Sequence, residues 1–213
     1  MFIHWLQERL TRELPGPSAH AQIWSYPRNS VAEGLILDPP PRASAVAMIL
    51  QPVSDLHFEL LYIVRSPFGI HGSQVAFPGG KIENGEDALG CACRETLEEI
   101  GIELQSDQCI GQLSPVFIPP SHMIVYPHVF VLQDKIENFS TTHEVDHVFW
   151  IDQQKIAPEN IMIKDHYLKA FDETRPIKGI VLNDHFLWGA SAMLTMELMT
   201  LHHEFSNELN APS

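Results

Sequence analysis

Residues 79–102 constrain the fold of this chain more than any other stretch, because they combine tight-turn glycines with a helix whose two ends are both marked. Glycines at positions 79, 80 and 85 predict a loop that bends sharply. Acidic residues at 86 and 87 place negative charge where a helix begins, and Gly101 is typical of the left-handed residue that ends one. The stretch therefore predicts a loop, a helix of about four turns over residues 88–100, and a second loop.

The two sides of this predicted helix differ in chemistry. At about 100° per residue, one stripe is mostly apolar and is expected to face the core. The other side carries three glutamates, Glu95, Glu98 and Glu99, at positions i, i+3 and i+4. The expected core stripe consists of Leu89, Cys93, Thr96 and Ile100.

Three carboxylates on one helix face repel one another unless a cation lies between them. A divalent ion such as Mg²⁺ or Mn²⁺ is the simplest counter-ion, since it takes oxygen ligands from a few carboxylates and leaves other positions for waters and substrate phosphates. Arg94, beside this face, can hold one carboxylate in a bidentate pair. The alternative is a merely solvated glutamate-rich face, which is the usual state of such a run of charges.

The order of the residues favours the metal site over the solvated face. Gly80, Glu86 and residues 94–102 (RETLEEIGI) follow the spacing of the Nudix box, and the chain resembles the Nudix hydrolases, which cleave nucleoside diphosphates linked to another moiety. Thr96 departs from the pattern, at a position that is usually aliphatic. The resemblance implies an α/β fold, a Nudix-type α/β/α sandwich with a mixed sheet and a loop-helix-loop catalytic motif.

Expected roles follow for individual residues of this site. The metal ligands are expected to be Glu95, Glu98, Glu99 and a backbone carbonyl of the turn formed by Gly79 and Gly80. The expected catalytic residues are Glu98, which completes the site or positions the water, Arg94, and Glu144 as general base. For Glu144, an ordinary exposed glutamate is the alternative. The expected substrate contacts are Arg65, His71, Phe77 and Lys81, and Phe77 has the alternative of packing beneath the metal loop.

Segments on both sides of the box narrow the expected substrate. Residues 60–66, 71, 74–80, 143–149 and 186–192 are similar to those of the coenzyme A diphosphatases within the Nudix superfamily. This resemblance implies hydrolysis of coenzyme A or its derivatives to 3′,5′-ADP and 4′-phosphopantetheine.

Four residues depart from that subfamily pattern. Gly69 and Ile70 stand where an arginine is expected, in a segment one residue shorter, while Ser73 replaces a glycine and Ile63 a threonine. A missing bidentate phosphate contact would change affinity or specificity, whereas hydrolysis itself should survive. Two alternatives therefore stay open: a Nudix hydrolase of ADP-ribose, NADH or nucleoside triphosphates, and a nucleotide-binding regulator without catalysis.

The length and net charge of the chain limit its domain organisation and its partners. The 213 residues suit one domain, expected over residues 43–207, after an N-terminal helix and proline-rich arm (1–42) and before a flexible tail (208–213). A net charge of −14 argues against a nucleic-acid surface, and the small-molecule nucleoside diphosphate is the expected partner. No apolar run reaches the ~18 residues of a membrane span, and no signal pattern is evident, so the expected location is cytoplasmic.

The remaining patterns predict the order of secondary structure. Three cysteines do not make a disulfide framework, and the dispersed histidines, including a pair at 202 and 203, are expected to be mostly solvated. The N-terminal helix is expected to pack on the domain or on a partner, which allows a homodimer. Helices are predicted at 3–14 and 190–205, an extended arm between 15 and 42, and strands at 45–50, 58–65, 74–77, 109–118, 124–132, 145–151 and as a pair within 180–188.

Overall fold

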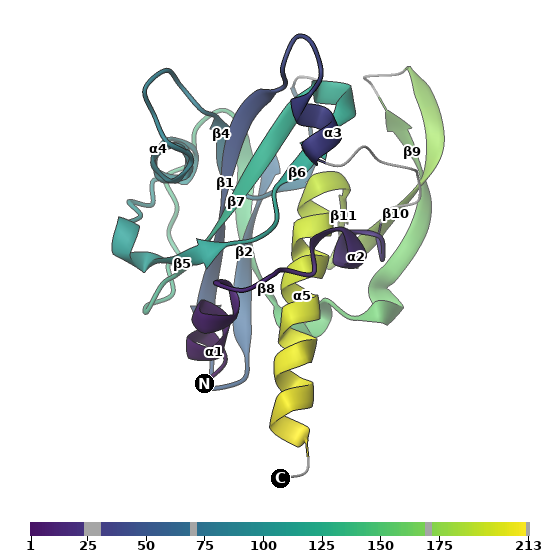
Figure 1. The fold of residues 1–213 in the computed structure, drawn as a ribbon. Coiled ribbons are helices and arrows are strands. Elements are labelled where there is room, and N and C mark those ends of the chain that lie inside the picture. Colours follow the sequence, from purple (N-terminus) through teal and green to yellow (C-terminus); the bar gives the residue numbers. More distant parts are fainter. Residues whose placement is uncertain (24–30, 69–71, 169–171, 212–213) are drawn as a thin grey trace.

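Strand β1 (Arg42–Pro52) lies at the centre of the larger of two sheets in the computed structural model, which describes residues 1–23, 31–68, 72–168 and 172–211 (Figure 1). It pairs antiparallel with β2 (Phe58–Arg65) and β4 (Gly79–Lys81) and parallel with β7 (Met123–Val131). The sheet is therefore mixed, and its main path runs β3-β2-β1-β7-β5. Its remaining strands are β3 (Val75–Ala76), β5 (Cys109–Gln112), β6 (Val116–Ile118), paired with β7, and β8 (Val145–Asp152), paired with β2.

A second, three-stranded sheet lies beside the first. It is antiparallel, in the order β11-β10-β9, and consists of β9 (Ile161–Leu168), β10 (Glu173–Leu182) and β11 (His185–Trp188). In Figure 1 this sheet lies on the side of the molecule opposite α4 (Ala88–Ile100). The sequence pattern predicts the β10–β11 hairpin but not β9. Most side chains of β9 are exposed, so the strand lacks the alternation that marks a half-buried one.

Helices cover both faces of the larger sheet. Helix α4 packs on one face, against β1 and β4, and α5 (Gly189–Asn210) lies on the other (Figure 1). The helices α1 (Phe2–Arg9) and α2 (Gly16–His20) pack against α5, and α3 (Val31–Leu35) contacts β6. Four short 3₁₀ turns complete the described elements, at Ser106–Gln108, Pro119–Ser121, Gln153–Lys155 and Pro158–Asn160.

Alternation along β1 produces the two cores that these helices cover. Met48 and Leu50 belong to the core beneath α5, whereas Ala47 and Ile49 belong to the core beneath α4. Successive side chains of a strand point to opposite faces, and a central strand buried on both faces is apolar throughout. This is the arrangement that the α/β prediction requires.

Helix α4 begins and ends at the predicted residues, but its buried face differs from the predicted stripe. Thr96 and Ile100 are buried as expected, while Cys91 and Ala92 are fully buried and Leu89 and Cys93 only partly. The helix packs on β1 and on the β4 turn, and this contact rotates the buried face toward the turn. This rotation also buries Glu99, one of the three glutamates on the side opposite the predicted core stripe.

The terminal segments differ from the predictions more than the sheet does. Helix α1 ends at Arg9 rather than at residue 14, and the arm predicted to be extended contains α2 and α3. Helix α5 continues to Asn210, three residues into the segment predicted as a tail. His202 is not on a solvated face: its ring packs against Phe2 at 5.0 Å and Phe58 at 5.7 Å.

Two further predictions concern disulfides and membrane spans. All three cysteines, Cys91, Cys93 and Cys109, are free thiols. Among the described residues, no helix is both long and apolar enough to cross a membrane.

Candidate active site

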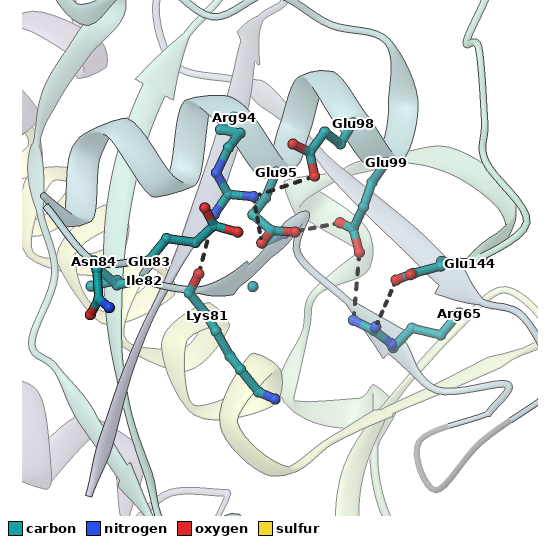
Figure 2. Close-up of a pocket in the computed structure, with 12 residues that line it drawn as sticks. Arg65, Lys81, Ile82, Glu83, Asn84, Arg94, Glu95, Glu98, Glu99 and Glu144 are labelled. Carbon is teal, nitrogen blue, oxygen red and sulfur yellow. Dashed lines mark hydrogen bonds and ion pairs between the residues drawn. The ribbon is translucent and has the colours of Figure 1, made fainter. Parts of the chain in front are cut away.

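An open cleft of about 900 Å³ lies between helix α4, the β4 turn and the end of β2 (Figure 2). Nine of the residues predicted for the site line it, and three cations face five carboxylates along its wall. The predicted residues are Arg65, Gly79, Gly80, Lys81, Arg94, Glu95, Glu98, Glu99 and Glu144, and the additional ones are Ile82, Glu83 and Asn84.

The ends of α4 fix which of its side chains face the cleft. The Asp87 carboxylate accepts a hydrogen bond from the Gly90 amide at 2.7 Å, and Gly101 adopts a left-handed conformation with φ of 73°. Side-chain capping of the first turn and a glycine at the last are local signals, so the helix position follows from nearby sequence. Held in this way, α4 places Glu95, Glu98 and Glu99 along one wall of the cleft.

The glycine turn approaches these carboxylates closely. The Gly79 amide donates a hydrogen bond to Glu99 Oε2 at 3.0 Å. A Cβ at Gly80 would run into the Glu95 carboxylate, and a Cβ at Gly79 would run into the carbonyl of Ala45. At position 79 the clash is with backbone and φ is 154°, so glycine is required there, whereas at position 80 a Cβ would displace the end of the Glu95 side chain.

Glu99 is the most unusual carboxylate of the cleft. It is 4% exposed, and burial raises its pKa to about 7. Burial also raises the pKa of Glu95, whereas the Glu98 side chain is 59% exposed. Desolvation disfavours a charged carboxylate, so the buried Glu99 and the partly buried Glu95 both favour a cation placed against them.

Arg94 holds the acidic side of the cleft together. Its Nε and Nη2 donate to the two oxygens of Glu86 at 2.8 and 3.0 Å. Its Nη1 donates to Glu95 at 3.0 Å and to Glu98 at 3.3 Å (Figure 2). Its Nη2 also donates to the backbone carbonyl of Lys81 at 3.2 Å. The bidentate pair lowers the pKa of Glu86 to about 2.

Arg65 lies on the other side of the cleft and contacts two further carboxylates. Its Nη1 is 3.6 Å from Glu99 Oε1 and its Nη2 is 3.8 Å from Glu144 Oε2. In Figure 2 these three side chains converge, whereas the Lys81 side chain extends away from the glutamates. The strand end that carries Arg65 pairs with the start of β8, which explains why Glu144, one residue before β8, reaches the site.

One predicted substrate contact, Phe77, does not line this cleft. Phe77 is 2% exposed and stacks on Tyr62 with ring centroids 4.9 Å apart, in the core beneath α5, so its predicted contact with substrate is wrong for this arrangement. The position of Phe77 agrees instead with the alternative prediction, in which its side chain packs in the interior. His71 lies outside the described residues, as do Gly69 and Ile70.

The sequence interpretation missed Ile82, Glu83 and Asn84. They follow the β4 turn directly, and the Glu83 amide donates to Glu86 Oε2 at 3.1 Å. Their position in the loop between two predicted site segments is the signal that would have identified them.

The donor chemistry of the cleft fits a hard divalent cation. Carboxylate oxygens and the carbonyls of a tight turn are the ligands that such ions prefer. Among the described residues, no three His, Cys, Asp or Glu side chains are gathered closely enough to hold a metal ion as they stand. Oxygens of Glu95, Glu98 and Glu99 each lie near an arginine instead, at 3.0, 3.3 and 3.6 Å.

Comparison with known proteins identifies the family. The profile of the NUDIX domain matches residues 40–171, more than half of the chain. The chain belongs to the Nudix family. This Nudix membership confirms the resemblance seen in Gly80, Glu86 and residues 94–102, together with the predicted α/β class. Nudix hydrolases generally need divalent cations such as Mg²⁺ or Mn²⁺, and this one is a pyrophosphatase that acts on nucleoside diphosphate derivatives.

Several relatives of this Nudix chain are coenzyme A diphosphatases. It is 30% identical to the mitochondrial coenzyme A diphosphatase NUDT8 of Mus musculus over 161 residues, which cover 73% of this chain and 75% of the mouse protein. Identity to NUDT8 of Homo sapiens is also 30%, over 79% of this chain and 70% of the relative. Identity to the peroxisomal coenzyme A diphosphatase ndx-8 of Caenorhabditis elegans is 28%, over 64% and 63%.

A solved structure supports the fold of this Nudix chain. The MutT/nudix family protein from Enterococcus faecalis superposes with a TM-score of 0.50 at 15% identity, covering 96% of this chain and 68% of that one. At this identity the likeness concerns the fold alone.

Proposed function

We propose that this Nudix hydrolase cleaves the diphosphate bond of coenzyme A or its derivatives, giving 3′,5′-ADP and 4′-phosphopantetheine. The observation that carries the proposal is the similarity to coenzyme A diphosphatases, which extends over about three quarters of the chain. The carboxylate cleft described above supplies a site of the matching chemistry.

Charge balance supports a metal-assisted reaction. The cleft presents five carboxylates and three cations, and its substrate is itself a polyanion. We infer that Glu95, Glu98, Glu99 and a carbonyl of the Gly79–Gly80 turn hold Mg²⁺ or Mn²⁺. When bound, such an ion neutralises phosphoryl oxygens and lowers the pKa of water. The residues beside these ligands orient the substrate and the attacking water, as described below.

Three side chains have proposed roles in the hydrolytic step. Glu98 orients the attacking water, and Glu144, whose side chain is 55% exposed, takes a proton from that water as its oxygen attacks one phosphorus in line. The bond from that phosphorus to the bridging oxygen breaks. Arg65 neutralises charge that gathers on the phosphoryl oxygens.

Arg94 acts one step away from the reaction, as a positioning residue. Its contacts with Glu95 and Glu98 hold these two carboxylates at the wall of the cleft, and its bond to the Lys81 carbonyl ties the turn to the helix. Lys81 lines the same cleft and is proposed as a substrate contact on the side away from the glutamates.

A substrate panel tests the proposal. The specificity constant kcat/KM is measured with Mg²⁺ or Mn²⁺ for coenzyme A, 3′-dephospho-coenzyme A, ADP-ribose, NADH and a nucleoside triphosphate. We expect coenzyme A to have the highest value, with a modest advantage over the 3′-dephospho form because one phosphate contact is worth about tenfold to a hundredfold. A clear preference for ADP-ribose, NADH or the triphosphate would contradict the substrate and leave the diphosphatase chemistry standing.

A further inference from the structure

The two arginines of the cleft are bound very differently. Arg94 donates hydrogen bonds of 2.8 to 3.3 Å to three glutamates and a carbonyl. Arg65 has only ion-pair contacts, at 3.6 Å to Glu99 and 3.8 Å to Glu144, and its guanidinium forms no hydrogen bond with any described residue. Contacts beyond 3.5 Å are electrostatic rather than hydrogen-bonded, so they restrain a guanidinium weakly.

Of the two carboxylates that Arg65 contacts, Glu99 is the one that most needs a counter-charge. The Glu99 side chain is 5% exposed, while that of Arg65 is 32% exposed and open to the cleft. Apart from Arg65, the contact that the described residues provide to Glu99 is the amide hydrogen bond from Gly79. A divalent ion that binds Glu99 therefore competes with the guanidinium to neutralise this carboxylate.

We propose that Arg65 is the exchangeable cation of this site: it neutralises Glu99 and Glu144 until the divalent ion binds, and it is then released to bind a phosphate of the substrate. The proposal rests on the metal-dependent diphosphatase function proposed above. One guanidinium serves two anions in turn, so its loss affects metal binding and phosphate binding in opposite directions. Release from Glu144 also leaves that carboxylate free to accept a proton from water.

Opposite changes in two affinities are the signature of this exchange. Without Arg65, the ion no longer competes with a guanidinium for Glu99, and a positive charge that repels the ion is absent. A partly exposed ion pair is worth up to about 1 kcal/mol, so Mn²⁺ should bind about threefold to fivefold more tightly. A phosphate that loses its arginine should bind about tenfold to a hundredfold more weakly.

The experiment measures both affinities in the full-length protein. Calorimetry gives the Kd of Mn²⁺ alone and then, at saturating Mn²⁺, the Kd of α,β-methylene-ADP, a diphosphate that cannot be hydrolysed at its bridge. Wild type is compared with Arg65→Gln and Arg65→Lys. We expect Arg65→Gln to tighten Mn²⁺ binding and weaken binding of the analogue, and Arg65→Lys to give intermediate values of both. Thermal melts of each variant confirm that the fold is retained.

Lys81→Gln is the matched control, because it removes one positive charge from the same cleft without removing a contact to Glu99. We expect it to change the Kd of Mn²⁺ by less than about twofold, since charges that are separated by solvent are screened. Equal tightening in both variants, or an unchanged or weaker Mn²⁺ affinity in Arg65→Gln, would overturn the exchange. If wild type neither binds Mn²⁺ nor hydrolyses any diphosphate, the proposed function itself fails, which is a different result.

Discussion

The surroundings of individual carboxylates in and beside the cleft shift their pKa values in opposite directions. The bidentate pair with Arg94 holds the pKa of Glu86 at about 2, while burial raises the pKa of Glu99 to about 7. Helical spacing was enough to predict that Glu95, Glu98 and Glu99 share a surface. It did not predict that Glu99 is buried, because that depends on a β4 turn that contacts the helix only in the folded protein. The burial of Phe77 was predicted only as an alternative, because it depends on packing against Tyr62 in the folded core.

At this scale, replacing Glu99 by glutamine should separate chemistry from stability. Glutamine keeps the side-chain length and can still accept the hydrogen bond from Gly79, so the melting temperature should stay near that of wild type. The metal loses a charged ligand, and turnover should fall by about two to three orders of magnitude. Glu103→Gln, an exposed position just beyond the helix, is the control. A Glu99→Gln enzyme with nearly full turnover would contradict the ligand role.

Whole elements depend on buried polar contacts as well as on apolar packing. Glu197 of α5 is 0% exposed and accepts hydrogen bonds from the Gly16 amide at 3.1 Å and from Ser114 Oγ at 2.6 Å, with His20 Nε2 at 2.9 Å. One carboxylate therefore fastens α2 and the segment before β6 to α5. The bounds of α4 could be predicted because its caps are local in sequence, whereas α2 depends on this distant contact and could not.

Removal of this carboxylate is expected to loosen the N-terminal elements. Glu197→Ala should lower the free energy of unfolding by about 3–5 kcal/mol, because the imidazole, hydroxyl and amide partners, which are buried or partly buried, would lose their acceptor. Chemical denaturation measures the change. Glu204→Ala, on the same helix, removes a more exposed pair with Arg9 and should cost about 1 kcal/mol or less. A similar loss in the two variants would contradict the fastening role.

The first helix, α1, packs against the last helix, α5. Phe2 packs on Phe205 with ring centroids 5.4 Å apart, and Trp5 Nε1 donates to Glu208 at 2.7 Å. His202 lies in the same contact, and its Nε2 is 3.0 Å from the Leu56 carbonyl. Composition and spacing predicted a solvated histidine here, because nothing in the sequence indicates that the first helix packs against the last.

Burial lowers the pKa of His202, and the sign of its effect on stability follows. Its folded pKa is below its unfolded value of about 6.5, so the unfolded state binds the proton more readily as the pH falls through that value. Its contribution to stability is therefore lost toward acid pH. Relative to wild type, His202→Gln should lose more stability at pH 8 than at pH 5, as measured by chemical denaturation at both values. A difference that does not change with pH would contradict this environment.

The central claim is that the carboxylate cleft hydrolyses a diphosphate with a divalent cation. Its most direct test follows the products of coenzyme A by chromatography, first in excess EDTA and then after Mg²⁺ or Mn²⁺ is supplied in excess of the chelator. We predict no hydrolysis in EDTA and the appearance of 3′,5′-ADP and 4′-phosphopantetheine once the ion is supplied. Hydrolysis that continues unchanged in excess EDTA, with no stimulation by either ion, would contradict the account.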